Sequence, residues 1–238
     1  MSLKKNIPNL FTCLNLLCGS VGIILVLQNQ DLKSGAYLIW LAGLFDFLDG
    51  FAARTLRVKS EIGKELDSLA DMVTFGLLPG IIIFAMIQSV SDNSWLPYSG
   101  LIIPVFSALR LAKFNIDVRQ TDQFIGLPTP ANALLISSLP FIISSEKSWL
   151  TETLPLPYLL SIISLVFSIL MVSEIRLMAL KFAGFQWAAN KMKYIFILSS
   201  ITVLILFRVK AFPLVIILYI LLSIVNNFLM PDTHNKSN

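Results

Sequence analysis

Four aspartates are the residues of this sequence whose type and spacing most clearly indicate chemistry. They occur as two pairs, Asp46 with Asp49 and Asp67 with Asp71. Spacings of three and four residues place the members of each pair on one face of a helix. A short basic segment separates the pairs, so the two helices are expected to be antiparallel neighbours whose four carboxylates converge.

The converging carboxylates predict a site for a divalent cation. Like charges repel one another unless cations lie between them, and oxygen ligands suit hard ions such as Mg²⁺ or Mn²⁺. A thiolate or imidazole site is not expected, because Cys13 and Cys18 form no Cys-x-x-Cys pair and the single histidine, His234, lies in a polar tail. The alternative is that the aspartates are solvated loop residues neutralised by nearby basic side chains.

The composition indicates a protein whose solvent is lipid. Of 238 residues, 56% are hydrophobic and 13% are charged, whereas soluble domains carry about 25% charged residues. The net charge of +4 does not indicate a nucleic-acid partner, because the basic residues are scattered between apolar runs and form no stripe. The sequence therefore predicts an all-α, polytopic transmembrane helix bundle that forms a single integral-membrane domain over residues 1–238.

Eight apolar segments have the length and composition of membrane spans. If the N-terminus is cytosolic, fourteen of the 18 Lys and Arg residues lie inside, and only Lys33, Lys147, Arg208 and Lys210 lie outside. This bias predicts that both termini are cytosolic, in the plasma membrane of a prokaryote. The predicted spans are residues 8–28, 34–55, 69–89, 97–115, 128–145, 155–173, 194–208 and 212–229.

These spans place the aspartates in the cytosolic leaflet. At about 1.5 Å of rise per residue, Asp46 is expected about 13 Å beneath the inner surface and Asp71 near that surface. Ionisable groups at membrane depth are costly and indicate function. A cation transporter is a distant alternative, but it would need carboxylates reachable from both sides, and here they cluster on the inner side.

The aspartates belong to a longer motif, Asp46-x-x-Asp49-Gly50-x-x-Ala53-Arg54, followed after eight residues by Gly63-x-x-x-Asp67-x-x-x-Asp71. This motif resembles the complete signature of the CDP-alcohol phosphatidyltransferase family. The resemblance implies a membrane enzyme that uses Mg²⁺ or Mn²⁺ to transfer a phosphatidyl group from CDP-diacylglycerol to a small alcohol, with release of CMP. It also implies a homodimer, and the span assignment predicts that the active site faces the cytosol.

The resemblance also implies roles for individual residues. All four aspartates would bind metal, and Asp71 would also be the general base. Small residues in the motif would let the cytidine and its phosphates approach closely, although small residues also serve membrane helix packing. Arg54 would bind phosphate or anchor the helix at the membrane surface. Near the N-terminus, Asn9 and Thr12 would contact the nucleotide, or form a helix cap and a back-bonded hydroxyl. The implied CDP-lipid contacts are Asn9, Thr12, Gly50, Ala53, Arg54 and Gly63.

Two further segments bear on the acceptor alcohol. Leu109-Arg110-Leu111-Ala112-Lys113-Phe114-Asn115 and Gly126-Leu127-Pro128-Thr129-Pro130 resemble the branch of the family whose acceptor is L-serine. Arg110 would hold the serine carboxylate in a bidentate pair, with Asn115 and Thr129 as polar contacts. Arg110 is alternatively a cytosolic anchor. Glycerol 3-phosphate, inositol phosphate and choline are the alternative acceptors.

Overall fold

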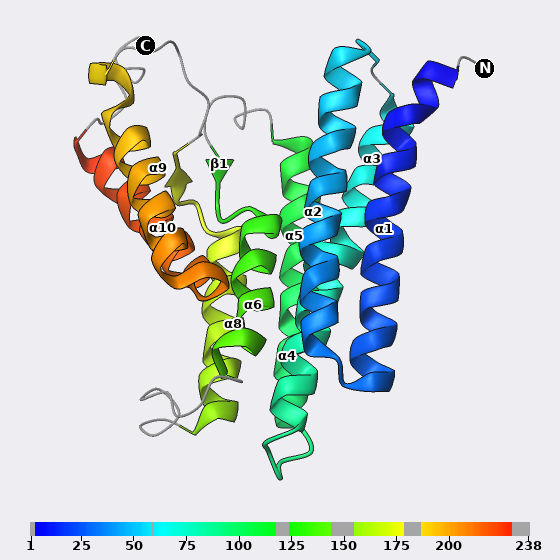
Figure 1. The fold of residues 1–238 in the computed structure, drawn as a ribbon, viewed down its shortest axis with the longest axis vertical. Coiled ribbons are helices and arrows are strands. Elements are labelled where there is room, and N and C mark those ends of the chain that lie inside the picture. The colour runs from blue at the N-terminus through cyan, green and yellow to red at the C-terminus, as the bar shows by residue number, and fades with distance from the viewer. Residues whose placement is uncertain (1–2, 59, 118–123, 144–154, 179–186, 230–238) are drawn as a thin grey trace.

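The computed structural model describes residues 3–58, 60–117, 124–143, 155–178 and 187–229. Figure 1 shows an elongated bundle in which nearly all of these residues are helical. Five helical stretches are long and apolar enough to cross a membrane, and two shorter apolar helices accompany them. The prediction of an all-α transmembrane bundle is therefore confirmed.

The first two helices form an antiparallel hairpin at one side of the bundle (Figure 1). Helix α1 spans Leu3–Asn29, and α2 spans Leu32–Thr55. Asp31 caps α2 by accepting a hydrogen bond of 3.0 Å from the Ser34 amide, and the hydrogen bonds from Ser34 hold the pKa of Asp31 below its usual range. The cap provides a defined start for the helix that carries Asp46 and Asp49.

The third stretch is longer than the sequence predicted. Helix α3 begins at Glu61 and ends at Asp71, followed without a break by a π-helical turn, η1 (Met72–Leu77), and by α4 (Leu78–Gln88). Helix α3 begins early because the Ser60 hydroxyl accepts a hydrogen bond of 3.2 Å from the Gly63 amide. Ten residues of helix thus separate Asp71 from the start of α3, a rise of about 15 Å.

The helix bounds do not place Asp71 nearer the end of the bundle than Asp46, as the predicted spans did. The predicted span began at residue 69, which placed Asp71 near the inner surface. Asp71 lies about 15 Å from the start of α3 at Glu61. Asp46 lies about 14 Å from the end of α2 at Thr55, so the two carboxylates lie at about the same level. Asp71 is 8% exposed. The sequence pattern missed this because the polar first turns of α3 resemble a loop.

The middle of the chain crosses the bundle three times, as α5 (Ile102–Ile116), α6 (Thr129–Ile143) and α8 (Leu156–Val172). A 3-10 turn, η2 (Leu96–Leu101), precedes α5. A short antiparallel ribbon joins β1 (Phe124–Ile125) to β2 (Arg176–Leu177). Gly126 follows β1 with φ +75°, and a Cβ there would meet the carbonyl oxygen of Met171, so only glycine permits this turn.

The last two helices form a tilted hairpin at the other side of the bundle (Figure 1). They are α9 (Trp187–Phe207) and α10 (Phe212–Leu229), joined by the 3-10 turn η3 (Arg208–Ala211). Arg208 has φ +52°, and the ring centroids of Phe196 and Tyr219 lie 5.5 Å apart. The apolar stretch therefore folds back on itself, as the two separate predicted spans require.

The core of the bundle is formed around α4. Leu78, Ile82, Ile83 and Ile87 are fully buried, so α4 contacts neighbours on every side, whereas α9 and α10 leave most of their apolar residues exposed or only partly buried, as a lipid-facing hairpin does. Close approach of α1 to this centre depends on Gly19, where a Cβ would lie 2.9 Å from the Thr74 Cα.

Each of the eight predicted spans corresponds to a helical stretch within the described residues, although residues 144 and 145 of the fifth lie outside them. The stretches alternate in direction, so the first turn of α1 and the last turn of α10 lie at the same end of the bundle (Figure 1). This arrangement agrees with the prediction that both termini share one side of the membrane. Which side that is remains a prediction from the charge bias.

A cysteine-accessibility experiment tests this topology. In a background with Cys13 and Cys18 replaced by alanine, Thr55→Cys should react with a membrane-impermeant maleimide only from the cytosol, and Asn93→Cys only from the opposite side. Val21→Cys, on the exposed apolar face of α1, serves as a control that should react from neither. Labelling of Thr55→Cys and Asn93→Cys from the same side would contradict the topology.

Candidate active site

Three of the four aspartates converge at one end of the bundle. Asp46 and Asp49 come from α2, and Asp67 comes from α3, which runs antiparallel to it after a short connection. One carboxylate oxygen from each lies within 4.8 Å of the other two. The predicted convergence of the two helical pairs is therefore found for these three residues.

Helix α1 supports this cluster through Thr12. The Thr12 hydroxyl lies 2.8 Å from Asp49 Oδ2, to which it donates, and 3.2 Å from the Pro8 carbonyl oxygen. Thr12 is buried, so this bond fixes the Asp49 carboxylate away from bulk water. Thr12 was predicted as a nucleotide contact or a back-bonded hydroxyl, and the structure adds a further contact, to a carboxylate of the cluster.

Asp71 lies outside the group of three and is held separately. Asn15 of α1 donates a hydrogen bond of 3.2 Å from Nδ2 to Asp71 Oδ1. The backbone carbonyl oxygen of Asn15 in turn accepts a hydrogen bond of 3.0 Å from the Thr74 hydroxyl in η1. Asn15 was not among the predicted site residues. Its position three residues after Thr12, on the same face of the helix, was a usable signal, because a fully buried asparagine in a membrane helix requires partners.

The donor set fits a divalent metal ion. The carboxylates supply hard oxygen ligands, and Asp67 Oδ1 is buried without a hydrogen-bond partner among the described residues. A buried, unpaired carboxylate oxygen beside two others is costly unless a cation binds there. Asp46, Asp49 and Asp67 would hold the metal, and Asp71 lies beside this group.

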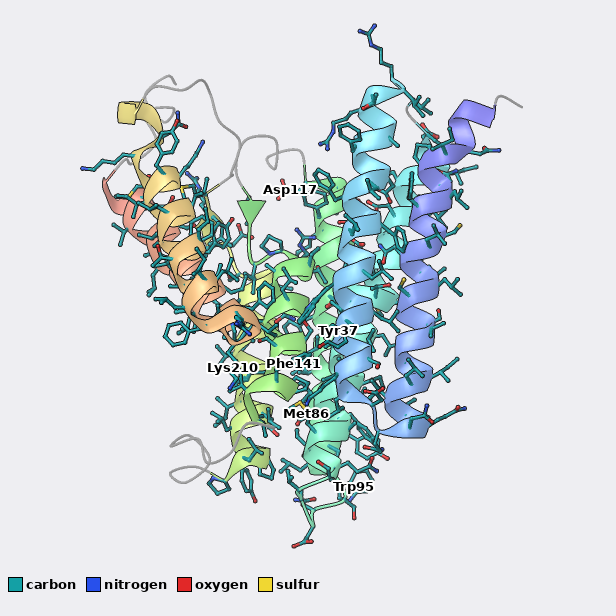
Figure 2. All side chains as sticks on the ribbon, in the orientation of Figure 1. Tyr37, Met86, Trp95, Asp117, Phe141 and Lys210 are labelled. Atoms are coloured by element: carbon teal, nitrogen blue, oxygen red, sulfur yellow. The ribbon has the colours of Figure 1, made fainter. Side chains whose placement is uncertain are left out.

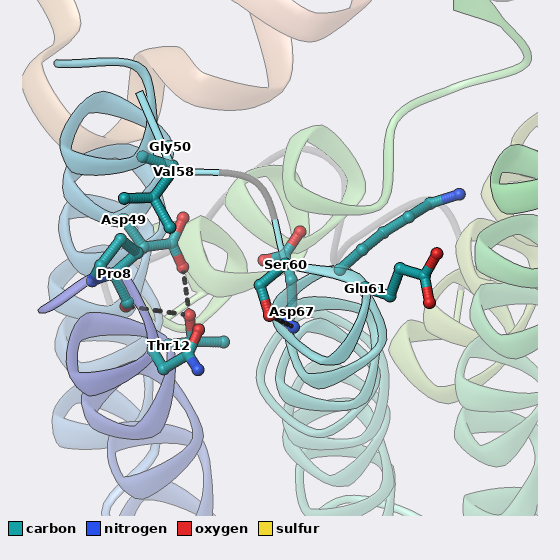
Figure 3. A pocket seen from close by; sticks show the side chains of 12 residues that line it. Pro8, Thr12, Asp49, Gly50, Val58, Ser60, Glu61 and Asp67 are labelled. Carbon is teal, nitrogen blue, oxygen red and sulfur yellow. Dashed lines mark hydrogen bonds between the residues drawn. The ribbon is translucent and has the colours of Figure 1, made fainter. Parts of the chain in front are cut away.

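A cavity of about 630 Å³ opens next to the cluster. Figure 3 shows Asp49 and Thr12 on one side of it, facing Ser60, Glu61 and Asp67 on the other. Its size falls in the range of cavities that bind small molecules, about 300–1,000 Å³. The described residues that line it include most of those expected to contact the CDP-lipid, namely Asn9, Thr12, Gly50, Ala53 and Gly63.

The small residues of the motif bear directly on this space. A Cβ at Gly63 would lie 3.0 Å from Asn9 Oδ1, and a Cβ at Gly50 would have only Arg54 Nη2, at 3.9 Å, in its neighbourhood. Gly63 thus permits close contact with α1, and Gly50 leaves the cavity wall open. Arg54 does not line the cavity but lies exposed beside Gly50, so its guanidinium reaches the rim.

A second cavity, of about 330 Å³, contains Arg110. Arg110 is 7% exposed, its guanidinium stacks 4.8 Å from the centroid of the Phe114 ring, and it interacts electrostatically with Asp71. This burial makes a simple membrane-surface anchor a poor account of Arg110. The cavity also contains charged residues of both signs, Lys113, Asp117 and Glu174.

The other two predicted acceptor contacts do not line this cavity. Asn115 instead donates a hydrogen bond of 2.8 Å to the Ser68 hydroxyl, and its carbonyl accepts one of 2.9 Å from Lys64 Nζ, so it ties the end of α5 to α3. Thr129 is fully buried at the start of α6, and its hydroxyl has no partner among the described residues. Asn115 therefore connects α5 to α3 in this structure, and Thr129 does not line the Arg110 cavity.

Most of the chain is similar to known proteins of one family. Residues 5–171 match the family model described as CDP-alcohol phosphatidyltransferase. A Bacillus subtilis protein named CDP-diacylglycerol–serine O-phosphatidyltransferase is 33% identical over 174 residues, which are 71% of this chain and 88% of that protein. Proteins of the same name from Helicobacter pylori (strain ATCC 700392 / 26695) and Mycobacterium leprae are 30% and 35% identical, over 92% and 62% of this chain. The matched part is 89% of the Helicobacter pylori protein but only about half, 51%, of the Mycobacterium leprae protein.

The chain therefore belongs to the CDP-alcohol phosphatidyltransferase family, and the resemblance predicted from the motif is confirmed. It is an integral-membrane enzyme of phospholipid biosynthesis. The family generally uses divalent metal ions, and the three converging carboxylates are consistent with that use.

The contact between Thr12 and Asp49 predicts an effect on metal affinity. Thr12→Val removes the hydroxyl that orients Asp49, and loss of such a supporting hydrogen bond typically lowers metal affinity by about 10- to 100-fold. Mn²⁺ binding to the purified protein, followed by electron paramagnetic resonance, measures the change. Thr202→Val, on the exposed face of α9, is the matched control. Equal affinities in both variants would contradict a metal site at Asp49.

Proposed function

We propose that this enzyme transfers the phosphatidyl group of CDP-diacylglycerol to L-serine, giving phosphatidylserine and CMP, with Mg²⁺ or Mn²⁺ as cofactor. The observation that carries the proposal is that two of the three clustered carboxylates, Asp49 and Asp67, line a cavity of the size that binds small molecules. The names of the relatives support serine as the acceptor.

The larger cavity suits the nucleotide end of the donor. Asn9 offers an amide for the cytosine edge, and Gly50, Ala53 and Gly63 leave room for the ribose and phosphates. Arg54 at the rim supplies a guanidinium for a phosphate oxygen. The diphosphate would then lie against Asp49 and Asp67, where a bound divalent metal would neutralise it and stabilise the departing CMP.

The protein's own part in the reaction centres on Asp71. Its carboxylate, oriented by Asn15, accepts the proton of the serine hydroxyl as the oxygen attacks the lipid-side phosphorus. The new phosphorus–oxygen bond forms while the bond to CMP breaks, so CMP leaves with the electron pair. Within the described residues the site offers no cysteine or Ser/His pair as a covalent nucleophile, which favours direct transfer.

The smaller cavity suits a zwitterionic acceptor. Arg110 presents a guanidinium for the serine carboxylate, and the acidic Asp117 and Glu174 in the same cavity favour the ammonium group. A phosphorylated acceptor such as glycerol 3-phosphate would favour a more uniformly basic lining. The guanidinium carbon lies 4.8 Å from the centroid of the Phe114 ring, a cation–π contact that restricts where the guanidinium can lie.

We also infer, from the family resemblance and the charge bias, that the active site faces the cytosol, that residues 1–238 act as one domain, and that the enzyme is a homodimer. Serine and CMP are water-soluble, and both are handled on the side where the basic loops lie.

An acceptor screen tests the proposed function. Purified protein with CDP-diacylglycerol and Mn²⁺ should release CMP with L-serine and not with glycerol 3-phosphate, inositol phosphate or choline. Asp46→Asn and Asp67→Asn should abolish CMP release, because each removes a carboxylate of the cluster, whereas Asp92→Asn, in an exposed loop, should not. Release with another acceptor would keep the reaction class and overturn serine. Activity in excess chelator would overturn the metal.

A kinetic prediction isolates Arg110. Arg110→Lys replaces a planar fork by a point charge, so the apparent KM for serine should rise about tenfold while the KM for CDP-diacylglycerol stays nearly unchanged. Arg176→Lys, on β2 and not lining either cavity, is the matched control. Parallel changes in both KM values would show that Arg110 supports the fold and does not bind the acceptor.

A further inference from the structure

An apolar groove lies outside the active site, between α6, α8 and the start of α10. It has a volume of about 330 Å³. Its walls are aliphatic and aromatic side chains, among them Leu139 of α6, Leu156 and Phe167 of α8, and Leu214 of α10. The one charged residue among its described lining residues is Lys210, in the turn η3 between α9 and α10.

Ring contacts place this groove in the half of the bundle away from the aspartates. Phe212, two residues after Lys210, packs 5.5 Å from Trp40 of α2. Trp40 lies six residues before Asp46 and nine before Asp49, separations of about 9 and 14 Å along the helix. Figure 2 likewise places Lys210 near the level of Phe141, far from Asp117 at the other end. The groove therefore faces the leaflet opposite the catalytic cluster.

The dimensions of the groove match one lipid chain. Along α8 its lining runs from Leu156 to Phe167, a distance of about 16 Å at helical rise. One leaflet contributes about half of a hydrocarbon core roughly 30 Å thick. The lining of the groove along α8 is thus about as long as the hydrocarbon part of one leaflet.

Lys210 gives the groove a charge preference. It is a cation set in a turn between two apolar helices, and charged groups within a membrane are costly unless they meet a counter-charge or reach the headgroup layer. Lys210 is the first residue of this lining on the α10 side, and Pro213 and Leu214 follow it. A bound lipid whose headgroup is anionic would supply the counter-charge.

We propose that this groove binds one acyl chain of an anionic phospholipid from the leaflet opposite the aspartates, with its headgroup phosphate on Lys210. The site is separate from the donor and acceptor cavities and does not depend on which alcohol the enzyme uses. It anchors the α9–α10 hairpin to the α6–α8 pair through a lipid, on a side where the hairpin is otherwise bounded largely by membrane.

Native mass spectrometry of the full chain in detergent tests the proposal. The protein is mixed with equimolar phosphatidylglycerol and phosphatidylcholine of identical acyl chains, and the retained lipids are counted. One near-surface cation favours an anionic lipid by about fivefold, so the wild-type protein should retain phosphatidylglycerol in that excess. Lys210→Gln should equalise the two lipids, whereas Lys210→Arg should keep the preference. The matched control is Lys33→Gln. Lys33 lies on α2, with its ammonium 5.9 Å from the centroid of the Phe141 ring, and this variant should also keep the preference for phosphatidylglycerol.

A second pair of variants tests the groove itself. Ile217 lines it and is 43% exposed, so Ile217→Trp should fill it without disturbing the buried core and should reduce the number of retained lipids by one. Ile205→Trp, on the exposed face of α9, should retain the wild-type number. Equal retention of both lipids by the wild-type protein, an unchanged preference in Lys210→Gln, or an unchanged count in Ile217→Trp would each overturn the proposal.

Discussion

The mutual repulsion of carboxylates in a membrane protein is the constraint on which the rest of this structure depends. Three carboxylate oxygens within 4.8 Å of one another are unfavourable in a medium of low dielectric constant unless a cation offsets their charge. Holding them there requires two helices that cannot separate. The short connection between α2 and α3, the cap at Ser60 and the packing of α1 against both meet this requirement.

Helix α1 illustrates how much of the site is built by residues that do no chemistry. Its polar face contacts Asp49 through Thr12 and Asp71 through Asn15, and Gly19 brings the helix backbone close to Thr74. One helix therefore positions carboxylates from two different elements. A displacement of α1 would alter both at once, which makes the cluster sensitive to packing several residues away from it.

The fold and the aspartates were predictable because both follow from local patterns. Apolar length gives the spans, and spacings of three and four residues give a shared helical face, so Asp46, Asp49 and Asp67 were correctly brought together. What could not be predicted depends on contacts between distant segments. The hydrogen bond from Asn15 to Asp71 and the docking of Asn115 on Ser68 both join residues whose proximity no spacing in the sequence reveals. The early start of α3 at Glu61 depends instead on a local cap from Ser60. The burial of Arg110 on Phe114 is partly visible in the sequence, because the two residues lie four apart on one helix.

The π-helical turn at Met72–Leu77 has a consequence for how the length of this chain can vary. A π turn contains one residue more than an α turn, so it rotates everything before it by about 100° relative to everything after it. Asp67 and Asp71 lie before the turn, and the buried α4 lies after it. Deleting one residue from the turn would leave a regular helix of equal apolarity and nearly equal length. The carboxylates of α3 would nevertheless turn away from α2 if α4 kept its place in the core. The angle between the helix face that carries the carboxylates and the face that packs in the core is thus set by a single extra residue. A hydropathy profile does not reveal that residue.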